Sequence, residues 1–467
     1  MPQLSEHLDN LVAGPHAPGR DYIVSKTTHA EVYALAACLQ QSVFPSKEEE
    51  TVCLCTTDKA VMAAALLAAV TRPVTLIIPH AFSEPVLARM HAAHPFSKAI
   101  LGRSDKGDET AELPAGVEKI RLDRWAAEAA APFDPARRDP DSIFVKLFTG
   151  GSTGAPAIWS KTVRNLFGEA LYHARKLAVI PEDRIAATVP PNHIYGLLFS
   201  VLMPLAASAS VIEDVLTYPR EIQQACSRDK ASILISIPLH YKMLHTTGLS
   251  AEAVRWAMSS AAPLPVSDSQ AFYQQTGVGV TEVYGSTETG GIATRCCAAS
   301  ETPFTVFDCI QWQITGDRLA IRSDFTSPEL PRTPEGFFIT GDRARAAGPH
   351  TFELGGRADR IVKIAGKRVD LDEVKAAILH MPQVRDAAVI CAPDQTARSG
   401  EIQALVETGA EKDAIRRFLR NRLEAYALPR RIRITDKMPL APTGKYDSRR
   451  IEVLLAANEA DPAGSRE

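Results

Sequence analysis

The segment Phe148-Thr-Gly-Gly-Ser-Thr-Gly-Ala-Pro156 decides how the rest of this chain is interpreted. It follows an apolar run, Ile143 to Phe148, that is typical of a buried strand. Glycines let a backbone approach a ligand closely, and successive amides with neighbouring hydroxyls form a concave anion-binding site. The segment is not a Walker A loop, because no Gly-Lys-Ser/Thr follows. Taken alone, it predicts either a phosphate-binding loop or a flexible glycine- and serine-rich turn.

Helical runs and short apolar strands alternate on both sides of this segment. Helices are predicted over residues 29–41, 60–70 and 83–93. Strands are predicted over residues 74–78, 143–148, 185–189, 208–212 and 233–236, with strand-rich sequence over 304–338. This alternation predicts an α/β fold with a large N-terminal domain of helix-covered, mostly parallel sheets.

The pattern beyond Arg357 is that of a second, smaller α+β domain. Its predicted elements are a hairpin over 361–369, helices over 371–379 and 412–423, and strands over 387–391 and 431–434. We therefore predict an N-terminal domain over residues 1–357, a C-terminal domain over 358–457 and a disordered tail over 458–467.

The charge of the chain limits its partners. Its 467 residues include 52 Lys and Arg against 55 Asp and Glu, which gives a net charge of −3. Without a global basic field we predict neither nucleic acid nor a membrane as a partner, so a phosphate ligand must be held by a local site. The first residues carry acids where a signal peptide is positively charged, and the eight cysteines are scattered. We therefore expect a cytoplasmic protein.

One uncharged stretch, Ile194 to Ile212, just reaches the length of a membrane span. It contains Gly196 and Pro204 and then becomes β-like near Ser210. This composition favours a buried helix followed by a buried strand, and we predict no membrane span.

A second informative segment is Val283-Tyr-Gly-Ser-Thr-Glu-Thr-Gly-Gly291. Its side chains have the chemistry of a nucleotide site: Tyr284 can stack on a base, Thr287 can bind a phosphate and Glu288 can hold Mg²⁺ through oxygen. A surface turn with a solvated glutamate is the alternative, and it would be preferred if this segment stood alone.

Further segments, in a fixed order, give the chain a family resemblance. It resembles the acyl-adenylate-forming (AMP-binding) superfamily of acyl-CoA and aryl-CoA synthetases, adenylation domains and luciferases. The matching segments are Thr149–Pro156, Pro191-Asn-His-Ile-Tyr-Gly196, Ser259-Ser-Ala-Ala-Pro-Leu264, Tyr284-Gly-Ser-Thr-Glu288, Thr340-Gly-Asp342, Gly356-Arg-Ala-Asp-Arg-Ile-Val-Lys363 and Pro442-Thr-Gly-Lys445. Each segment is short, but their joint order is highly specific.

The resemblance implies a role for each matching residue. Lys445, Thr287 and Glu288 would be catalytic, with Glu288 also the ligand to Mg²⁺. The residues that would bind ATP and AMP are Thr149, Gly150, Gly151, Ser152, Thr153, Gly154, Ala261, Ala262, Pro263, Tyr284, Gly285, Ser286, Thr287, Asp342 and Arg357. The pocket for the acid would contain His193, Tyr195, Gly196, His240, Tyr241 and Ser260. Asp359 would be the hinge of a mobile C-terminal domain.

Two departures from the family pattern refine this expectation. Ala157 stands where the family loop has a lysine, so Lys161 either supplies the missing charge to ATP or is a solvated lysine. The region before residue 149 is also short for the family. Both traits resemble the ligases of aryl-polyene and xanthomonadin-type pigment pathways, which activate hydroxybenzoates.

The predicted function is ATP-dependent adenylation of a carboxylic acid, followed by transfer to a thiol. ATP and Mg²⁺ are the expected cofactors, and the thiol belongs to coenzyme A or to the phosphopantetheine arm of an acyl carrier protein. Polar aromatic pocket residues favour an aryl acid such as a hydroxybenzoate. The alternatives are a medium-chain acyl ligase and a catalytically reduced adenylate-binding protein.

Overall fold

The chain folds into two compact units. A computed structural model describes residues 4–46, 48–102, 112–122, 132–149, 157–244, 249, 254–298, 302–364, 367–392, 401–420, 422–441 and 444–456. One unit comprises residues 1–312 with 321–338, and the other comprises residues 313–320 with 339–467.

One sheet of the first unit carries the glycine-rich segment. Its strand order is β6-β5-β3-β4-β7-β8, and only the β7–β8 pair is antiparallel. The strands are β3 (Glu50–Cys55), β4 (Val74–Ile78), β5 (Lys98–Leu101), β6 (Glu118–Arg121), β7 (Ile143–Thr149) and β8 (Ala157–Thr162). Helix α4 (Glu84–Ala93) packs Leu87 and Met90 against Cys53 and Ile77 of one face. Helix α3 (Lys59–Thr71) is buried along its whole length.

A second sheet of the first unit has the strand order β15-β14-β13-β12-β11-β9-β10-β1-β2. These strands are β1 (Asp21–Ile23), β2 (Thr27–Thr28), β9 (Arg184–Ala187), β10 (Ser210–Val211), β11 (Ile233–Ser236), β12 (Trp256–Ser259), β13 (Val280–Ser286), β14 (Gly290–Cys296) and β15 (Phe304–Val306). The strands from β1 and β10 to β13 run parallel, whereas β14 and β15 continue the sheet in antiparallel pairs.

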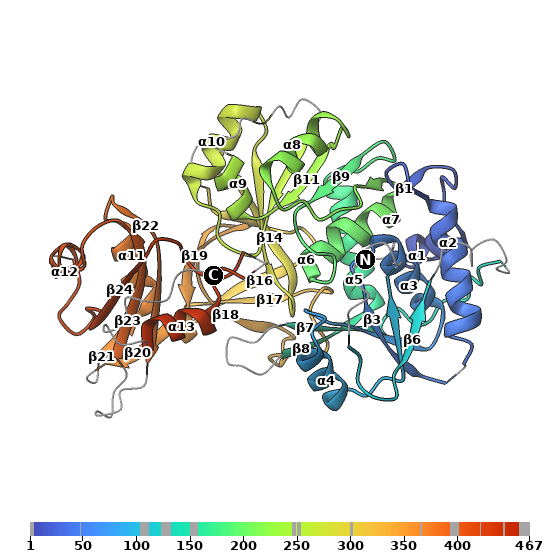
Figure 1. Cartoon of the computed structure of the whole chain (residues 1–467), viewed down its shortest axis with the longest axis horizontal. Helices are drawn as coiled ribbons and strands as arrows, with labels where there is room; N and C mark the ends of the chain where they lie inside the picture. Colours follow the sequence, from blue (N-terminus) through green and yellow to red (C-terminus); the bar gives the residue numbers. More distant parts are fainter. Residues whose placement is uncertain are drawn as a thin grey trace. The chain divides into compact units, whose positions relative to one another are not determined.

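Helices cover this second sheet and link the two. Helices α8 (Pro219–Ser227), α9 (Pro238–Leu244) and α10 (Val266–Thr276) lie together in Figure 1 and bury Ile222, Tyr241 and Phe272 against Leu234 and Val280. The remaining helices are α1 (Leu4–Ala13), α2 (His29–Cys38), η1 (Leu39–Val43), α5 (Val163–Lys176), α6 (Ile194–Leu197), η5 (Leu198–Leu202) and α7 (Met203–Ala207). Helix α5 follows β8 directly, because Thr162 forms a capping box with Asn165.

The second unit is built on a small sheet, β22-β23-β24. Its strands are β22 (Val384–Ala392), β23 (Glu401–Thr408) and β24 (Arg431–Thr435). Alternating residues point to opposite faces: Val389 faces helices α11 (Leu371–Leu379) and α12 (Lys412–Arg420), and Ala388 faces α13 (Ser448–Ala456). The other elements are β16 (Gln311–Thr315), β17 (Arg318–Arg322), β18 (Phe338–Gly348), β19 (Thr351–Arg357), η6 (Ala358–Arg360), β20 (Ile361–Ile364) and β21 (Lys367–Asp370).

The structure bears out the predicted α/β class, with two differences in detail. The strands whose ranges were not predicted from the sequence include β3, β5, β6, β8, β14 and β23. The second unit also begins before residue 358, because the β18–β19 hairpin carries the chain into it from Ile339 onward. The hinge at Asp359 stays a prediction: its backbone lies in η6, and its side chain is outside the described residues, as is the tail over 458–467.

The apolar stretch near residue 200 is a buried helical segment followed by a strand, as predicted. Residues 194–207 form α6, η5 and α7, and the chain then enters β10. Within the described ranges, no helix is long and apolar enough to cross a membrane.

Candidate active site

Polar side chains gather at the carboxyl ends of three parallel strands of the second sheet. Ser236 ends β11 and Ser259 ends β12, and the two are register partners, while Thr188 follows β9. Thr188 Oγ1 lies 2.9 Å from Ser236 Oγ and 2.8 Å from His240 Nδ1. Ligands of open α/β sheets bind at this edge. These hydroxyls therefore mark where a polar substrate group can be held.

The predicted segment Pro191 to Gly196 contacts both sheets of the first unit. Asn192 donates a hydrogen bond of 3.0 Å to the carbonyl of Pro79, which follows β4. His193 precedes α6, and the buried Tyr195 ring lies 5.2 Å from that of Phe199, edge to face. The Tyr195 hydroxyl is buried, and it makes no hydrogen bond of good geometry to the described residues beyond a weaker contact with the Ser236 backbone. Burial raises the Tyr195 pKa, which the neighbouring Ser236 backbone partly offsets.

His240 and Tyr241, predicted together for the acid pocket, have different environments. His240 is buried beside Thr188, and burial lowers its pKa, so that its imidazole is neutral at neutral pH. Tyr241 is a core residue: it is fully buried and donates a hydrogen bond of 2.8 Å to the Met258 carbonyl. Its hydroxyl is already used, so Tyr241 supports the pocket from behind rather than lining it.

The predicted adenine-binding segment, Ser259 to Leu264, is fixed to β13 by hydrogen bonds. Ser260 Oγ donates to the Val283 carbonyl at 2.9 Å, and the Leu264 amide donates to Glu282 Oε1 at 3.1 Å. Between these contacts Ala261 has a φ of +75°, a conformation that costs a non-glycine residue about 1–3 kcal/mol. Such strain is concentrated at functional sites, which agrees with the predicted role of Ala261, Ala262 and Pro263.

The predicted turn from Tyr284 to Glu288 is held by hydroxyl groups. The Ser286 amide donates to Thr289 Oγ1 at 3.1 Å, and the Thr289 amide donates to Ser286 Oγ at 3.3 Å. Gly285 is required, because an added Cβ would lie 2.4 Å from the Gly290 carbonyl oxygen. Thr287 and Glu288 remain half-buried at the top of this turn. Thr289 was not predicted, although its spacing of three from Ser286 is that of a reciprocal cap.

The glycine-rich segment lies between the paired strands β7 and β8. Thr149 is the register partner of Ala157, so the loop is the connection of a β-hairpin. Residues 150–156 and the Thr149 side chain lie outside the described part of the structure. The phosphate-binding roles of Gly150, Gly151, Ser152, Thr153 and Gly154 therefore stay predictions.

Lys161 is buried, which excludes the alternative of a solvated lysine. It lies on β8, its side chain is 0% exposed, and its ammonium donates to the carbonyls of Phe325 at 3.0 Å and Glu288 at 3.4 Å. Burial lowers the pKa of Lys161 to about 8, although the carboxylates of Glu169, Glu288 and Glu329 act in the opposite direction.

This pKa predicts how stability depends on pH. Between about pH 8 and the ordinary lysine value of 10.5, unfolded chains bind a proton that folded chains lack, so stability rises with pH. The free energy of unfolding of the wild type, minus that of Lys161→Met, is expected to increase by about 3 kcal/mol across this range. Urea denaturation at several pH values measures it. The control is Lys437→Met, which replaces an exposed lysine. If the stability difference from the wild type is independent of pH for both variants, the burial of the Lys161 ammonium is contradicted.

In the second unit the two predicted ribose-binding residues face each other. Asp342 on β18 and Arg357 on β19 are register partners, and Arg357 Nη1 lies 3.7 Å from Asp342 Oδ1. The Asp342 amide also donates to Thr340 Oγ1 at 3.2 Å. A carboxylate can accept bonds from vicinal hydroxyls, and a guanidinium supplies a planar fork of donors. Their juxtaposition fits the predicted contact with a ribose.

Lys445 lies in a tight turn of the second unit. Leu440 and Tyr446 form a bridge at its base, the Ala441 amide donates to the Lys445 carbonyl at 2.8 Å, and Gly444 has a φ of +76°. The Lys445 side chain is exposed. Next to it the Tyr446 hydroxyl donates to Asp386 Oδ1 at 2.6 Å and accepts from Lys375 Nζ at 2.6 Å. The sequence did not identify this anchor.

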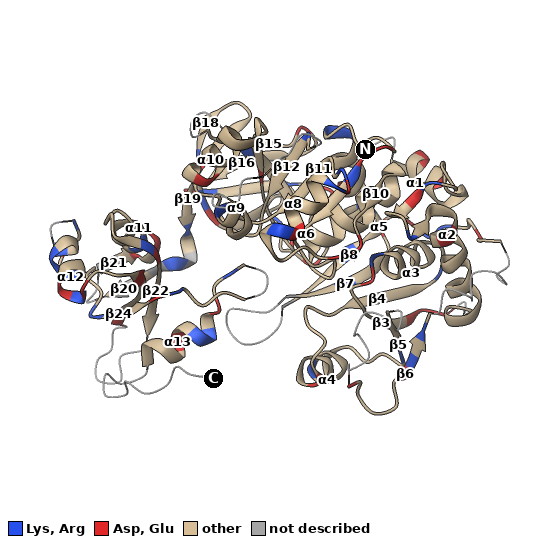
Figure 2. Cartoon of the chain, turned by 45° about the horizontal axis from the view of Figure 1, so that its top comes forward, with Lys and Arg blue, Asp and Glu red and all other residues tan. Residues whose placement is uncertain are grey.

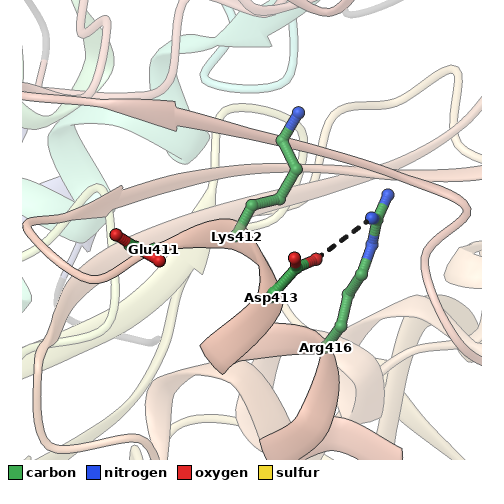
Figure 3. Close-up of a pocket in the computed structure, with 4 residues that line it drawn as sticks. All are labelled: Glu411, Lys412, Asp413 and Arg416. Carbon is green, nitrogen blue, oxygen red and sulfur yellow. Dashed lines mark hydrogen bonds and ion pairs between the residues drawn. The ribbon is translucent and has the colours of Figure 1, made fainter.

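A hollow elsewhere in the second unit does not belong to this site. Figure 3 shows Glu411, Lys412, Asp413 and Arg416 around the start of α12, with Arg416 3.5 Å from Asp413. Both signs of charge occur there and along the other described elements in Figure 2, and none of the predicted nucleotide or acid residues lines the hollow.

Comparison with known proteins identifies the family. Residues 26–341 match the family of AMP-binding enzymes, and residues 373–445 match the AMP-binding enzyme C-terminal domain. The first match covers more than half of the chain, which therefore belongs to the AMP-binding enzyme family.

Individual relatives agree with this assignment. The sulfoacetate–CoA ligase of Cupriavidus necator is 26% identical over 349 aligned residues, covering 68% of each chain. The 4-coumarate–CoA ligase of Rhodobacter capsulatus is 28% identical over 326, covering 69% of this chain and 80% of that protein. The crystal structure of ATP-bound MatB from Rhodopseudomonas palustris shares the fold, with a TM-score of 0.82, 20% identity, and coverage of 95% of this chain and 97% of that chain.

The chain is thus an AMP-forming acid–CoA ligase, a class of enzyme that uses ATP with Mg²⁺ and takes coenzyme A as co-substrate. In the described ranges no group of three or more His, Cys, Asp or Glu side chains could hold a metal. A single half-buried carboxylate, Glu288, nevertheless fits Mg²⁺, because this ion is usually bound by one or two carboxylates together with substrate phosphates and water.

Proposed function

We propose that this ligase adenylates an aromatic acid, with a hydroxybenzoate as the model substrate, and passes the acyl group to coenzyme A or to the phosphopantetheine arm of an acyl carrier protein. The observation that carries the choice of acid is that two buried hydroxyls, Tyr195 Oη and Ser259 Oγ, make no hydrogen bond of good geometry to the described residues.

These two hydroxyls favour a substrate with a polar ring. A buried polar atom without a partner costs about 1–3 kcal/mol, and a phenolic hydroxyl can both donate to and accept from such atoms. An alkyl chain offers neither. The neutral His240 imidazole beside Thr188 adds a further polar and flat surface at the same strand ends. The acid named for the Rhodobacter relative, 4-coumarate, is also aromatic.

The proposed chemistry uses the described side chains for positioning and for charge stabilisation. The substrate carboxylate attacks the α-phosphate of ATP, and pyrophosphate leaves. In this proposal Lys445 would offset the negative charge that gathers between carboxylate and phosphate, and Asp342 and Arg357 would hold the ribose. Glu288 would hold Mg²⁺, which when bound would supply positive charge to the phosphates. Fixed charges of this kind act most strongly on the transition state, where the charge develops.

A panel of acids tests the substrate. Pyrophosphate release with hydroxybenzoates, 4-coumarate, benzoate, sulfoacetate and octanoate should give kcat/KM at least about tenfold higher for a hydroxybenzoate than for benzoate, since one satisfied buried hydroxyl is worth about 1.4 kcal/mol. Tyr195→Phe should reduce this preference while leaving the KM for ATP unchanged. A preference for octanoate or sulfoacetate over every aromatic acid would contradict the proposal, and a preference for octanoate would favour the medium-chain alternative.

A further inference from the structure

Buried charged residues hold the turn that carries Glu288 from behind. The Glu288 carbonyl accepts two hydrogen bonds, from the Ser327 amide at 2.8 Å and from Lys161 Nζ at 3.4 Å. The same ammonium donates to the Phe325 carbonyl at 3.0 Å. One lysine of β8 therefore ties together two chain segments that are distant in sequence.

Glu169 of α5 holds the other end of the turn. Its Oε1 accepts a hydrogen bond of 2.6 Å from the Gly291 amide. Its Oε2 packs so closely against Gly290 that an added Cβ would lie 2.5 Å away, and Gly290 has a φ of +68°. Glu169 is 1% exposed. The turn between β13 and β14 thus lies between the Lys161 ammonium, bound to the Glu288 carbonyl, and the Glu169 side chain, bound to the Gly291 amide at the start of β14.

We propose that Lys161 is a positioning residue for Glu288: by binding the Glu288 carbonyl from inside the protein, it fixes the point from which the Glu288 carboxylate reaches Mg²⁺ and the phosphates of ATP. This inference rests on the proposed role of Glu288. It replaces the direct contact with phosphate that the sequence suggested, because the Lys161 side chain has no exposed surface and its ammonium faces two backbone carbonyls.

The cost of burial supports a functional role. A buried charge is expensive unless it is paired and hydrogen-bonded, and an apolar residue of similar size would fill the same space at lower cost. A residue that only packs would remove one of the two hydrogen bonds that the Glu288 carbonyl accepts and would leave the one from the Ser327 amide. Small displacements of positioning groups matter, since a misplacement of about 1 Å can cost on the order of 10²-fold in rate.

The test compares Lys161→Met with a matched control, Lys59→Met. Lys59 is also a buried lysine of the first unit, and its ammonium donates to the carbonyls of Ile212 at 2.6 Å and Asp214 at 3.2 Å. The readout is the Kd for ATP, measured by calorimetry with excess Mg²⁺ and with EDTA. Lys161→Met should weaken ATP binding by on the order of tenfold with Mg²⁺ and little with EDTA, and Lys59→Met should change neither value. If Lys161→Met does not fold, Lys161→Gln, which keeps an amide donor, takes its place.

A double-mutant cycle with Glu288→Gln separates this inference from the proposed function. If Lys161 acts through Glu288, the double variant should bind MgATP no more weakly than Glu288→Gln alone. Multiplicative losses would show that Lys161 acts independently and would overturn the inference. So would a Lys161→Met variant that behaves like Lys59→Met while Glu288→Gln is impaired. A Mg²⁺ dependence that Glu288→Gln leaves unchanged would instead overturn the role of Glu288 itself.

Discussion

Replacing Lys445 with alanine is expected to slow pyrophosphate release by about 10²–10³-fold while leaving thioester formation from supplied acyl-adenylate close to the wild-type rate. The first half-reaction gathers negative charge between the attacking carboxylate and the α-phosphate, and the role proposed for Lys445 is to offset that charge. The second half-reaction, attack of a thiol on the adenylate, no longer develops that charge. The two rates should therefore separate in this variant, measured with ATP and with synthetic acyl-adenylate respectively.

The structure of the turn supports Lys445 as a presented cation rather than a packed one. The side chain is exposed, while Tyr446 beside it is fixed by Asp386 and Lys375, and the turn is closed by the bridge between Leu440 and Tyr446. Removal of an exposed side chain should cost within about 0.5 kcal/mol of stability.

The control for this variant is Lys437→Ala, which removes another exposed lysine of the same unit. It should leave both half-reactions unchanged. If both rates fall together in Lys445→Ala, or if neither falls, the role assigned to Lys445 is wrong. Unchanged thermal stability in both variants would confirm that the comparison reports on chemistry.

The sequence predicted elements well where their hydrophobic pattern is local. Strands β4 and β11 and helix α11 have the predicted bounds. Strand β8 was missed, because Ala157–Thr162 carries Lys161 at its centre and stands beside a glycine-rich segment, both of which weaken a strand pattern. Strand β23 was missed although its run Ile402–Val406 contains apolar residues, because Gln403 and the flanking glutamates interrupt it.

Only those residues of the candidate site that lie in recognisable sequence motifs were predictable. Asp342 and Arg357 lie fifteen residues apart in sequence and the hairpin brings them together, which agrees with the roles that the resemblance implies. Lys161 could not be placed from sequence, because its partners Glu288 and Phe325 are more than a hundred residues away. From sequence alone, Glu169 has the character of a solvated residue of a helix. A signal that could have indicated its role is the Gly290–Gly291 pair, because adjacent glycines allow close approach by another group.

Gly196 is where a single methyl group should do most damage to the acid side of the site. A Cβ on Gly196 would lie 2.0 Å from the Pro190 carbonyl oxygen and 2.7 Å from the Pro190 carbonyl carbon. Both are backbone atoms, so no side chain can rotate away to relieve the contact. Gly196→Ala must therefore displace either α6, which carries Tyr195, or the preceding segment, which carries Pro190 and His193.

The expected result for Gly196→Ala is a loss of about 3 kcal/mol in the free energy of unfolding, at the upper end of what overpacking usually costs. In the folded fraction, the KM for the acid should rise more than the KM for ATP, because the displaced segment lies at the predicted acid pocket. The matched control is Gly168→Ala in helix α5, where an added Cβ would only touch Leu4 at 3.7 Å and Phe325 at 3.9 Å. There alanine should stabilise the protein by about 0.5–1 kcal/mol, since glycine is unfavourable inside a helix. Urea denaturation and pyrophosphate-release kinetics measure both variants. If Gly196→Ala were as stable as the wild type, the close contact between Gly196 and the Pro190 carbonyl would be contradicted. The inference that this packing positions Tyr195 would then be wrong.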